Sequence, residues 1–204
     1  MRQVTRAGLR DAGTNLVAAG LYLLFAAVHL QGFAATARPS LLVVVAMETL
    51  VAVLFLLRAP ATRASLSPYA WITTLGGTVT PLLLRPVDVS HDVLLGQVIQ
   101  CAGGALAVAS LASLNRSFGL LPAVRPLRFG GPYRWVRHPI YAAYTIQNAG
   151  YLASNASARN LALVALAFGF QVLRVYNEER VLSSVPEYGR YMERTRWRLL
   201  PLVF

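Results

Sequence analysis

Six apolar segments separated by short polar ones dominate the chain. They cover residues 15–35, 40–57, 69–84, 93–114, 140–153 and 161–176. The first is long enough for a helix to cross a hydrocarbon layer about 30 Å thick. The fifth is shorter, and we expect it to form a helical hairpin with the sixth. The pattern predicts an all-α, polytopic membrane helix bundle of about six membrane helices in a single integral membrane domain, 1–204.

The composition agrees with a membrane protein and excludes an ordinary soluble domain. The chain is 56% hydrophobic and only 13% charged, and its mean hydropathy is +0.51. All 19 basic residues are arginine, and the formal net charge is +11. The arginines lie at the ends of the apolar segments, which favours contact with anionic membrane lipids over nucleic acid.

The positions of the arginines also predict an orientation. With six crossings and both termini inside, only Arg38, Arg85 and Arg159 lie outside. Because cytoplasmic loops are enriched in arginine, we expect both termini and the polar segment 115–139 to be cytoplasmic, in the inner (plasma) membrane of a bacterium. The single cysteine, Cys101, excludes a disulfide within the chain. No cluster of histidine and cysteine stands at ligand spacing, so no metal is expected.

A carboxylate lies near the middle of the second apolar segment. Glu48 is costly to bury in a membrane without a partner. It either pairs with His29, near the end of the first segment, or is protonated against a neighbouring helix. Glu48 and His29 then stabilise the bundle or, together with Tyr144 of the fifth segment, contact a substrate.

The densest polar cluster is "GGPYRWVRHPIYAAY", residues 130–144. Pro139 suits the first turn of a helix and favours an extended conformation of the residue before it. We therefore expect His138 to project from the turn and to donate a hydrogen bond to a ligand. Tyr133 offers an aromatic face to a base or a cation, whereas Trp135 is expected to be an interfacial membrane anchor.

A second polar cluster begins where the last apolar segment ends. Arg174 and Glu178 are four residues apart and share one helical face, whereas Glu179 and Arg180 point elsewhere. An arginine and a glutamate at this spacing are either a helix-stabilising pair or the two halves of a receptor for a zwitterion. In the second case the guanidinium takes a carboxylate and the glutamate takes an ammonium group.

Together, these motifs resemble a known enzyme family. "GGPYRWVRHPIY" is followed by "RVYNEERVL" and then by "PEYGRYMERTRWRLLP". This ordered set resembles the isoprenylcysteine carboxyl methyltransferase family of integral membrane enzymes and, more distantly, phospholipid N-methyltransferases. The resemblance covers about residues 118–201, and it implies a cytoplasm-facing pocket for S-adenosylmethionine.

The resemblance also implies which residues contact this cofactor. Carried over position by position, they are Leu127, Tyr133, His138, Pro139, Ile140, Tyr141, Arg174 and Glu178. Where family members often have a histidine two residues before the leucine, this chain has Arg125. Residues 115–204 are then the cofactor-binding catalytic region, and the four spans within 1–114 face the substrate and the lipid.

The activity implied is methyl transfer from S-adenosylmethionine to a lipid-embedded acceptor, such as the carboxylate of an isoprenoid-like or other amphiphilic molecule. A carboxylate needs no general base, so positioning is the main contribution of the protein. We expect Arg137 to orient the anionic acceptor through charge-assisted hydrogen bonds, although an arginine at this place also suits a role in membrane topology. An amine acceptor would instead require a group that removes a proton, such as Glu48, Glu179 or a tyrosine.

Two other functions remain open at this point. The C-terminal helices also resemble those of membrane reductases of the sterol type, which bind NADPH, and the tyrosine-rich tail suits that function. A membrane scaffold or carrier without catalysis is the third possibility. The small-residue faces at Gly76 and Gly103 suit helix packing within one chain or between two, so the oligomeric state is left open.

Overall fold

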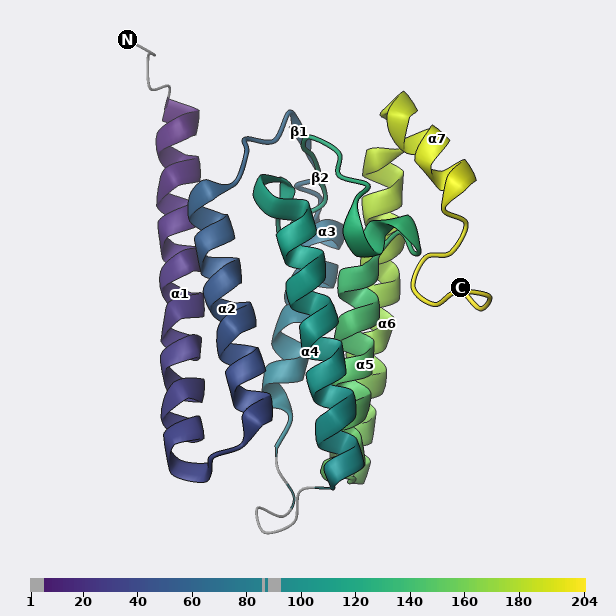
Figure 1. Cartoon of the computed structure of the whole chain (residues 1–204). Coiled ribbons are helices and arrows are strands. Elements are labelled where there is room, and N and C mark those ends of the chain that lie inside the picture. Colours follow the sequence, from purple (N-terminus) through teal and green to yellow (C-terminus); the bar gives the residue numbers. More distant parts are fainter. Residues whose placement is uncertain (1–5, 86, 88–92) are drawn as a thin grey trace.

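The computed structural model describes residues 6–85, 87 and 93–204. The described chain folds mainly into α-helices, and the long ones lie side by side along one direction (Figure 1). In chain order they are α1 (Arg6–Thr36), α2 (Pro39–Leu57), α3 (Pro68–Val79), α4 (Leu94–Leu114), α5 (Pro139–Ser154), α6 (Ala158–Leu182) and α7 (Pro186–Arg194). The all-α prediction is confirmed.

Short elements connect these helices. Helix α3 continues into the 3-10 helix η1 (Thr80–Leu83), and the segment after α4 contains η2 (Asn115–Ser117) and η3 (Gly131–Arg134). Two-residue strands β1 (Arg63–Ala64) and β2 (Ala123–Val124) pair antiparallel. This pairing ties the α2–α3 loop to the α4–α5 connection.

Local sequence signals set where several helices begin. Proline stands at the first residue of α2, α3, α5 and α7, where its missing N–H has no partner in any case. Ser67 caps α3 and Ser157 caps α6, because each side chain accepts a hydrogen bond from a backbone N–H of the first turn. The helices therefore begin close to the starts of the predicted apolar segments.

Three of the described helices are long and apolar enough to cross a membrane. They contain Gly13–Thr36, Leu94–Ser117 and Ala158–Leu182, and Leu41–Leu57 is apolar but shorter. Large apolar side chains on their outer faces are exposed, including Leu16, Leu24, Val28 and Leu161. Soluble proteins rarely expose so much apolar surface, so this arrangement indicates an integral membrane protein.

Helices α4 and α5 pack most closely where glycine replaces a side chain. A Cβ atom on Gly103 would lie 2.6 Å from the backbone nitrogen of Gln147. A Cβ atom on Gly150 would lie 2.5 Å from the backbone nitrogen of Gln100. The glycine face predicted at Gly103 therefore serves packing within one chain, and it fixes the position of α5, which begins at the polar cluster.

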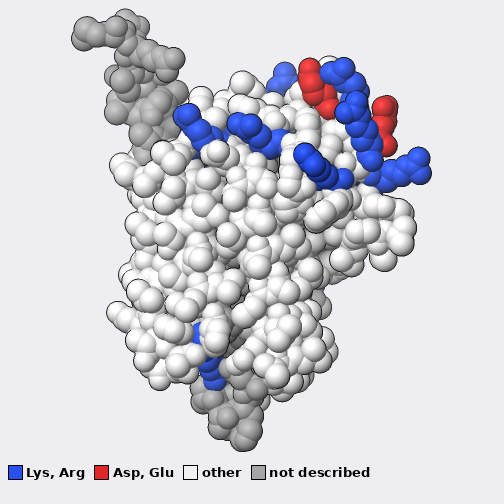
Figure 2. Space-filling view, in the orientation of Figure 1, with Lys and Arg blue, Asp and Glu red and all other residues white. Residues whose placement is uncertain are grey.

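The charged residues gather at one end of the bundle. Figure 2 shows most basic side chains along the end that carries α7, above a broad region without charged residues. The α1–α2 and α5–α6 connections lie at the opposite end (Figure 1). Arg38 and Arg159 belong to that opposite end, as the counting of arginines predicts.

Candidate active site

The polar cluster begins with a tight turn against α4. Gly131 has a φ of +58°, and a Cβ atom at this position would lie 2.3 Å from the Ser113 hydroxyl. Only glycine adopts this conformation without cost and leaves room for the approach to α4. The chain then passes through Tyr133 and His138 before α5 begins at Pro139, which confirms the predicted helix start.

His138 lies between the two adjacent glutamates of α6. Its Nε2 is 3.3 Å from a carboxylate oxygen of Glu179, and its Nδ1 is 3.6 Å from one of Glu178. The ring is buried, which opposes its charged form, but both carboxylates favour that form. The pKa of His138 is therefore raised above its ordinary value of 6.5.

Glu179 is the centre of an ion cluster that joins three segments of the chain. One carboxylate oxygen accepts a hydrogen bond from Arg137 Nε at 2.7 Å and faces His138. The other oxygen accepts from Arg198 Nε at 3.0 Å. Glu179 is buried, and its three partners come from the turn before α5 and from the segment after α7, so its contacts hold these segments together.

The C-terminal segment is attached to the start of α5 by further bonds to Arg137 and His138. Arg137 Nη1 donates to the carbonyl oxygens of Thr195 and Arg196 at 3.0 and 2.9 Å. The backbone nitrogen of Arg137 donates to the carbonyl oxygen of Trp197, and that of His138 to the carbonyl oxygen of Arg198, each at 2.8 Å. Arg137 therefore positions the chain around His138 and Glu179.

Glu178 faces the other way, into the bundle, with Arg174 and Tyr141. The Tyr141 hydroxyl donates a hydrogen bond to Glu178, and the guanidinium carbon of Arg174 lies 5.0 Å from the centre of the Tyr141 ring. Arg174 Nη2 donates to the carbonyl oxygen of Leu120 at 3.1 Å. Its buried Nε has no hydrogen-bond partner among the described residues.

Arg174 and Glu178 share a face, as their spacing predicts, but they form no salt bridge with each other within the described chain. Opposite charges in one cavity normally pair, because burial of an isolated charge is costly. Here each charge is held by other groups, the two attract each other electrostatically without a salt bridge, and both side chains line the cavity.

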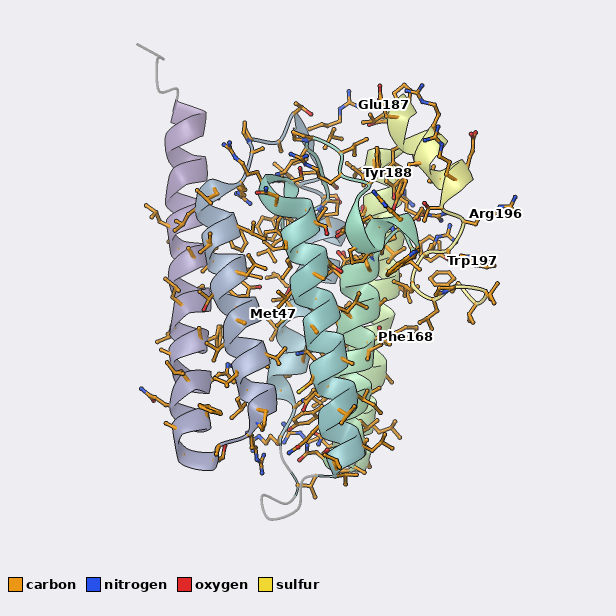
Figure 3. The ribbon with its side chains drawn as sticks, viewed as in Figure 1. Met47, Phe168, Glu187, Tyr188, Arg196 and Trp197 are labelled. Carbon is orange, nitrogen blue, oxygen red and sulfur yellow. The ribbon has the colours of Figure 1, made fainter. Side chains whose placement is uncertain are left out.

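A cavity of about 500 Å³ runs through the bundle next to these residues. Met47, midway along α2, and Tyr188, on α7, both line it, and Figure 3 shows that they lie at different depths along the helices. Ten residues that the sequence predicted as site residues line this cavity: Glu48, Leu127, Tyr133, Arg137, His138, Ile140, Tyr141, Tyr144, Arg174 and Glu178. The cavity therefore extends from the basic end of the bundle to its middle.

Two predicted site residues do not line this cavity. Pro139 is buried as the first residue of α5. His29 lies behind Glu48, and its Nδ1 is 2.9 Å from a Glu48 carboxylate oxygen. The expected alternative in which Glu48 pairs with His29 is therefore the one observed, and it leaves Glu48 buried at the cavity wall.

Tyr133, Tyr188 and Tyr191 line the cavity at the end of the bundle that carries α7. The Tyr191 hydroxyl donates to the carbonyl oxygen of Tyr133 at 2.7 Å, and the ring of Phe129 stacks on Tyr191 at 4.5 Å. The buried Tyr188 hydroxyl has no partner among the described residues. Burial raises the pKa of Tyr133, Tyr188 and Tyr191, so these phenols stay protonated and can only donate or accept hydrogen bonds.

Sequence reasoning missed several residues of this site. Tyr22 of α1 and Gln147 of α5 line the cavity, and Arg198 belongs to the ion cluster beside it. Glu179 was considered only as a group that could remove a proton, and its place at the centre of the cluster was not predicted. The helical period predicted that Glu179 points away from Glu178, and the structure confirms this. The period could not reveal the partners of Glu179, because Arg198 reaches it only through the folding of the segment after α7.

Comparison of the chain with models of known protein families and with curated protein sequences gave no match. The motif residues and their geometry therefore carry the functional interpretation.

Proposed function

We propose that this protein is an integral membrane methyltransferase that uses S-adenosylmethionine and acts on a lipophilic acceptor. The observation that carries the proposal is the cavity wall at Arg174 and Glu178, where a cation and an anion line the same space without a salt bridge between them. The resemblance of the surrounding motifs to isoprenylcysteine carboxyl methyltransferases supports the same activity.

The residues present fit the amino-acid part of S-adenosylmethionine. The unpartnered Nε of Arg174 is a buried donor that a carboxylate would satisfy. Glu178 would accept from the ammonium group, and His138 and Tyr141 hold its carboxylate in place. Tyr133, Leu127 and Ile140 supply aromatic and apolar walls for the remainder of the cofactor, and Pro139 fixes the turn that presents them.

When bound, S-adenosylmethionine would supply a methyl group on a positively charged sulfur, and its transfer to a carboxylate forms an O–C bond as the S–C bond breaks, without moving a proton. The chain contributes a largely apolar cavity that excludes water and holds both reactants. The phenols that line it remain neutral and add no competing negative charge.

The inner end of the cavity suits the apolar part of an amphiphilic acceptor. Phe25, Met47 and Val51 line this region together with Glu48, and Tyr144 lines the cavity about one turn of α5 beyond Tyr141. Glu48 would repel a second carboxylate. The reacting carboxylate of the acceptor would therefore lie toward the arginines, with its chain directed to Glu48 and the partner of Glu48, His29.

Arg137, expected to orient the anionic acceptor directly, is proposed to act on it only indirectly. Its Nε and Nη1 groups are committed to Glu179 and to two carbonyl oxygens of the C-terminal segment. We therefore assign Arg137 as a positioning residue that holds His138 and the cavity wall. Its loss should lower both cofactor affinity and thermal stability, whereas a residue that only contacts the acceptor would raise KM alone.

The proposal includes six membrane crossings, with both termini and the cofactor end in the cytoplasm of a bacterial cell. The shorter helices α3 with η1, α2 and α5 run alongside the three long ones in the same bundle (Figure 1), which supports counting them as crossings. The basic end would face the cytoplasm, where a soluble cofactor reaches Arg174 and Glu178. The four spans before residue 115 would then select the acceptor.

Titration calorimetry with detergent-solubilised protein tests the cofactor. We expect saturable binding of S-adenosylmethionine that weakens about ten- to hundredfold in Arg174→Met and in Glu178→Gln, since each loses a charge-assisted contact of about 1.5–3 kcal/mol. Glu187→Gln, an exposed change on α7, is the matched control. Saturable NADPH binding without S-adenosylmethionine binding would replace this proposal with a reductase, and binding of neither would favour a scaffold.

A further inference from the structure

A second hollow lies on the outside of the bundle, next to the C-terminal segment. It has a volume of about 390 Å³ and shares no lining residue with the central cavity. We call it the arginine groove, and its walls are Arg134, Trp135, Arg194, Thr195, Arg196, Trp197 and Pro201. One wall comes from the end of η3 and the following residue, and the other from the end of α7 and the segment after it.

The arginine groove carries positive charge without an acidic residue in its wall. Arg134, Arg194 and Arg196 are exposed, and none of them forms a salt bridge among the described contacts. Glu193 directly precedes Arg194 on α7 but does not line the groove, and Glu179 binds Arg137 and Arg198. Three guanidinium groups around one hollow repel each other, and a bound anion would offset this repulsion.

The surroundings of the arginine groove place it at the edge of the lipid. Trp135 is 70% exposed, and Leu202 and Val203 of the same C-terminal segment are 83% and 75% exposed. Figure 3 shows Arg196 and Trp197 at the outer edge of the bundle, below α7. Exposed tryptophan beside arginine is typical of the headgroup region of a membrane.

We propose that the arginine groove binds the phosphate of an anionic phospholipid. The headgroup phosphate would accept charge-assisted hydrogen bonds from the three guanidinium groups, while Trp135 and Trp197 contact the glycerol and upper acyl region. A soluble phosphate offers the same charge, but the exposed apolar residues beside the groove favour a ligand that also carries acyl chains.

A lipid in the arginine groove would join the two segments that the active-site cluster also joins. Arg134 lies three residues before Arg137, and the carbonyl oxygens of Thr195 and Arg196 accept hydrogen bonds from Arg137. A phosphate that bridges Arg134 to Arg194 and Arg196 would therefore hold the C-terminal segment against the start of α5. Anionic lipid would then stabilise this segment independently of the acceptor and of any cofactor.

Tryptophan fluorescence in nanodiscs tests the proposal directly. The chain has three tryptophans, and Trp71 on α3 can be replaced by phenylalanine so that only the two groove tryptophans report. The nanodiscs contain phosphatidylcholine with increasing amounts of brominated phosphatidylglycerol or, separately, brominated phosphatidylcholine. We expect quenching that saturates at low phosphatidylglycerol and rises only in proportion to content for phosphatidylcholine.

Variants of the groove arginines test whether these residues bind phosphatidylglycerol. Arg194→Gln should weaken the apparent affinity for phosphatidylglycerol about fivefold, and the same change at Arg134 and Arg196 should add to it, since each arginine near an anionic lipid contributes about 1 kcal/mol. Arg190→Gln, on α7 but outside the groove, is the control. The single Arg194→Gln variant decides the test if the triple variant does not fold.

Three results would overturn the proposal. The first is equal quenching by the two brominated lipids. The second is an unchanged phosphatidylglycerol affinity in Arg194→Gln, with the same thermal midpoint in phosphatidylcholine as the parent protein. The third is displacement of the brominated phosphatidylglycerol by millimolar inorganic phosphate, which would identify a site for a soluble anion.

Discussion

Replacement of Glu179 by glutamine removes the charge at the centre of the ion cluster. Its carboxylate accepts from Arg137 at 2.7 Å and from Arg198 at 3.0 Å, and it lies 3.3 Å from His138 Nε2. Glutamine has the same shape but only one acceptor oxygen, and its amide group must face one of these donors. Arg137 would keep its two carbonyl partners and lose its counterion.

The size of the effect follows from burial. The side chains of Glu179 and Arg137 are 9% and 7% exposed, and loss of one partner from a buried pair costs about 3–5 kcal/mol. The contact with Arg198 adds less, because that side chain is 31% exposed and partly solvated. We therefore expect the Glu179→Gln variant to lose about 3–5 kcal/mol of unfolding free energy. Glu187→Gln, whose partner Arg190 is 70% exposed, should lose less than about 1 kcal/mol.

Unfolding in mixed micelles with increasing dodecyl sulfate measures this difference, and limited trypsin digestion locates it. The Glu179→Gln variant should be cleaved rapidly at Arg194 and Arg196, since these residues precede the segment that the cluster holds. The Glu187→Gln variant should resist cleavage like the parent protein. A Glu179→Gln variant within about 0.5 kcal/mol of the parent, with an equally resistant C-terminal segment, would refute the assigned role of the cluster.

Three further changes test other parts of the structure. Gly103→Val should destabilise the protein by about 1–3 kcal/mol or more in micelle unfolding, because a side chain there meets the backbone at Gln147, and an unchanged stability would contradict the α4–α5 packing. The raised pKa of His138 contributes stability that is complete below its ordinary pKa of 6.5 and is lost as the pH rises through the higher folded value, so stability should fall above pH 6.5 and His138→Gln should flatten this slope. A parent protein whose stability does not change over that range would contradict the contacts of His138. Tyr141→Phe should weaken S-adenosylmethionine binding about tenfold by releasing Glu178, and an unchanged affinity would show that this hydrogen bond does not prepare the site.

The sequence predicted the helices well because their signals are local. Apolar length, proline at the first residue and serine caps act within a few residues, so α2, α5 and α6 begin close to the expected positions. Local signals do not determine the number of membrane crossings. Among the described residues, three helices are long enough to span a membrane, whereas the apolar part of α2, α3 with η1, and α5 are shorter. Whether the shorter ones cross depends on how they pack in the bundle.

The candidate site was predictable where one helix or one turn defines it. Arg174 and Glu178 share a cavity because residues four apart share a helical face, and His138 lies beside Pro139 at the helix start. Adjacent residues on a helix point about 100° apart, so Glu178 and Glu179 necessarily meet different partners. The identity of those partners, such as Arg198, depends on tertiary contacts that no local pattern encodes.

The central claim is methyl transfer to a lipophilic acceptor, and labelling of cellular lipids tests it most directly. Cells that express the parent protein, Glu178→Gln or Glu187→Gln are fed methyl-labelled methionine, and their lipid extracts are compared with those of cells without the protein. The account predicts a labelled lipid that is present with the parent protein and with Glu187→Gln and is lost with Glu178→Gln. Identical labelled lipid profiles in all four extracts, with equal protein in the membrane, would contradict it.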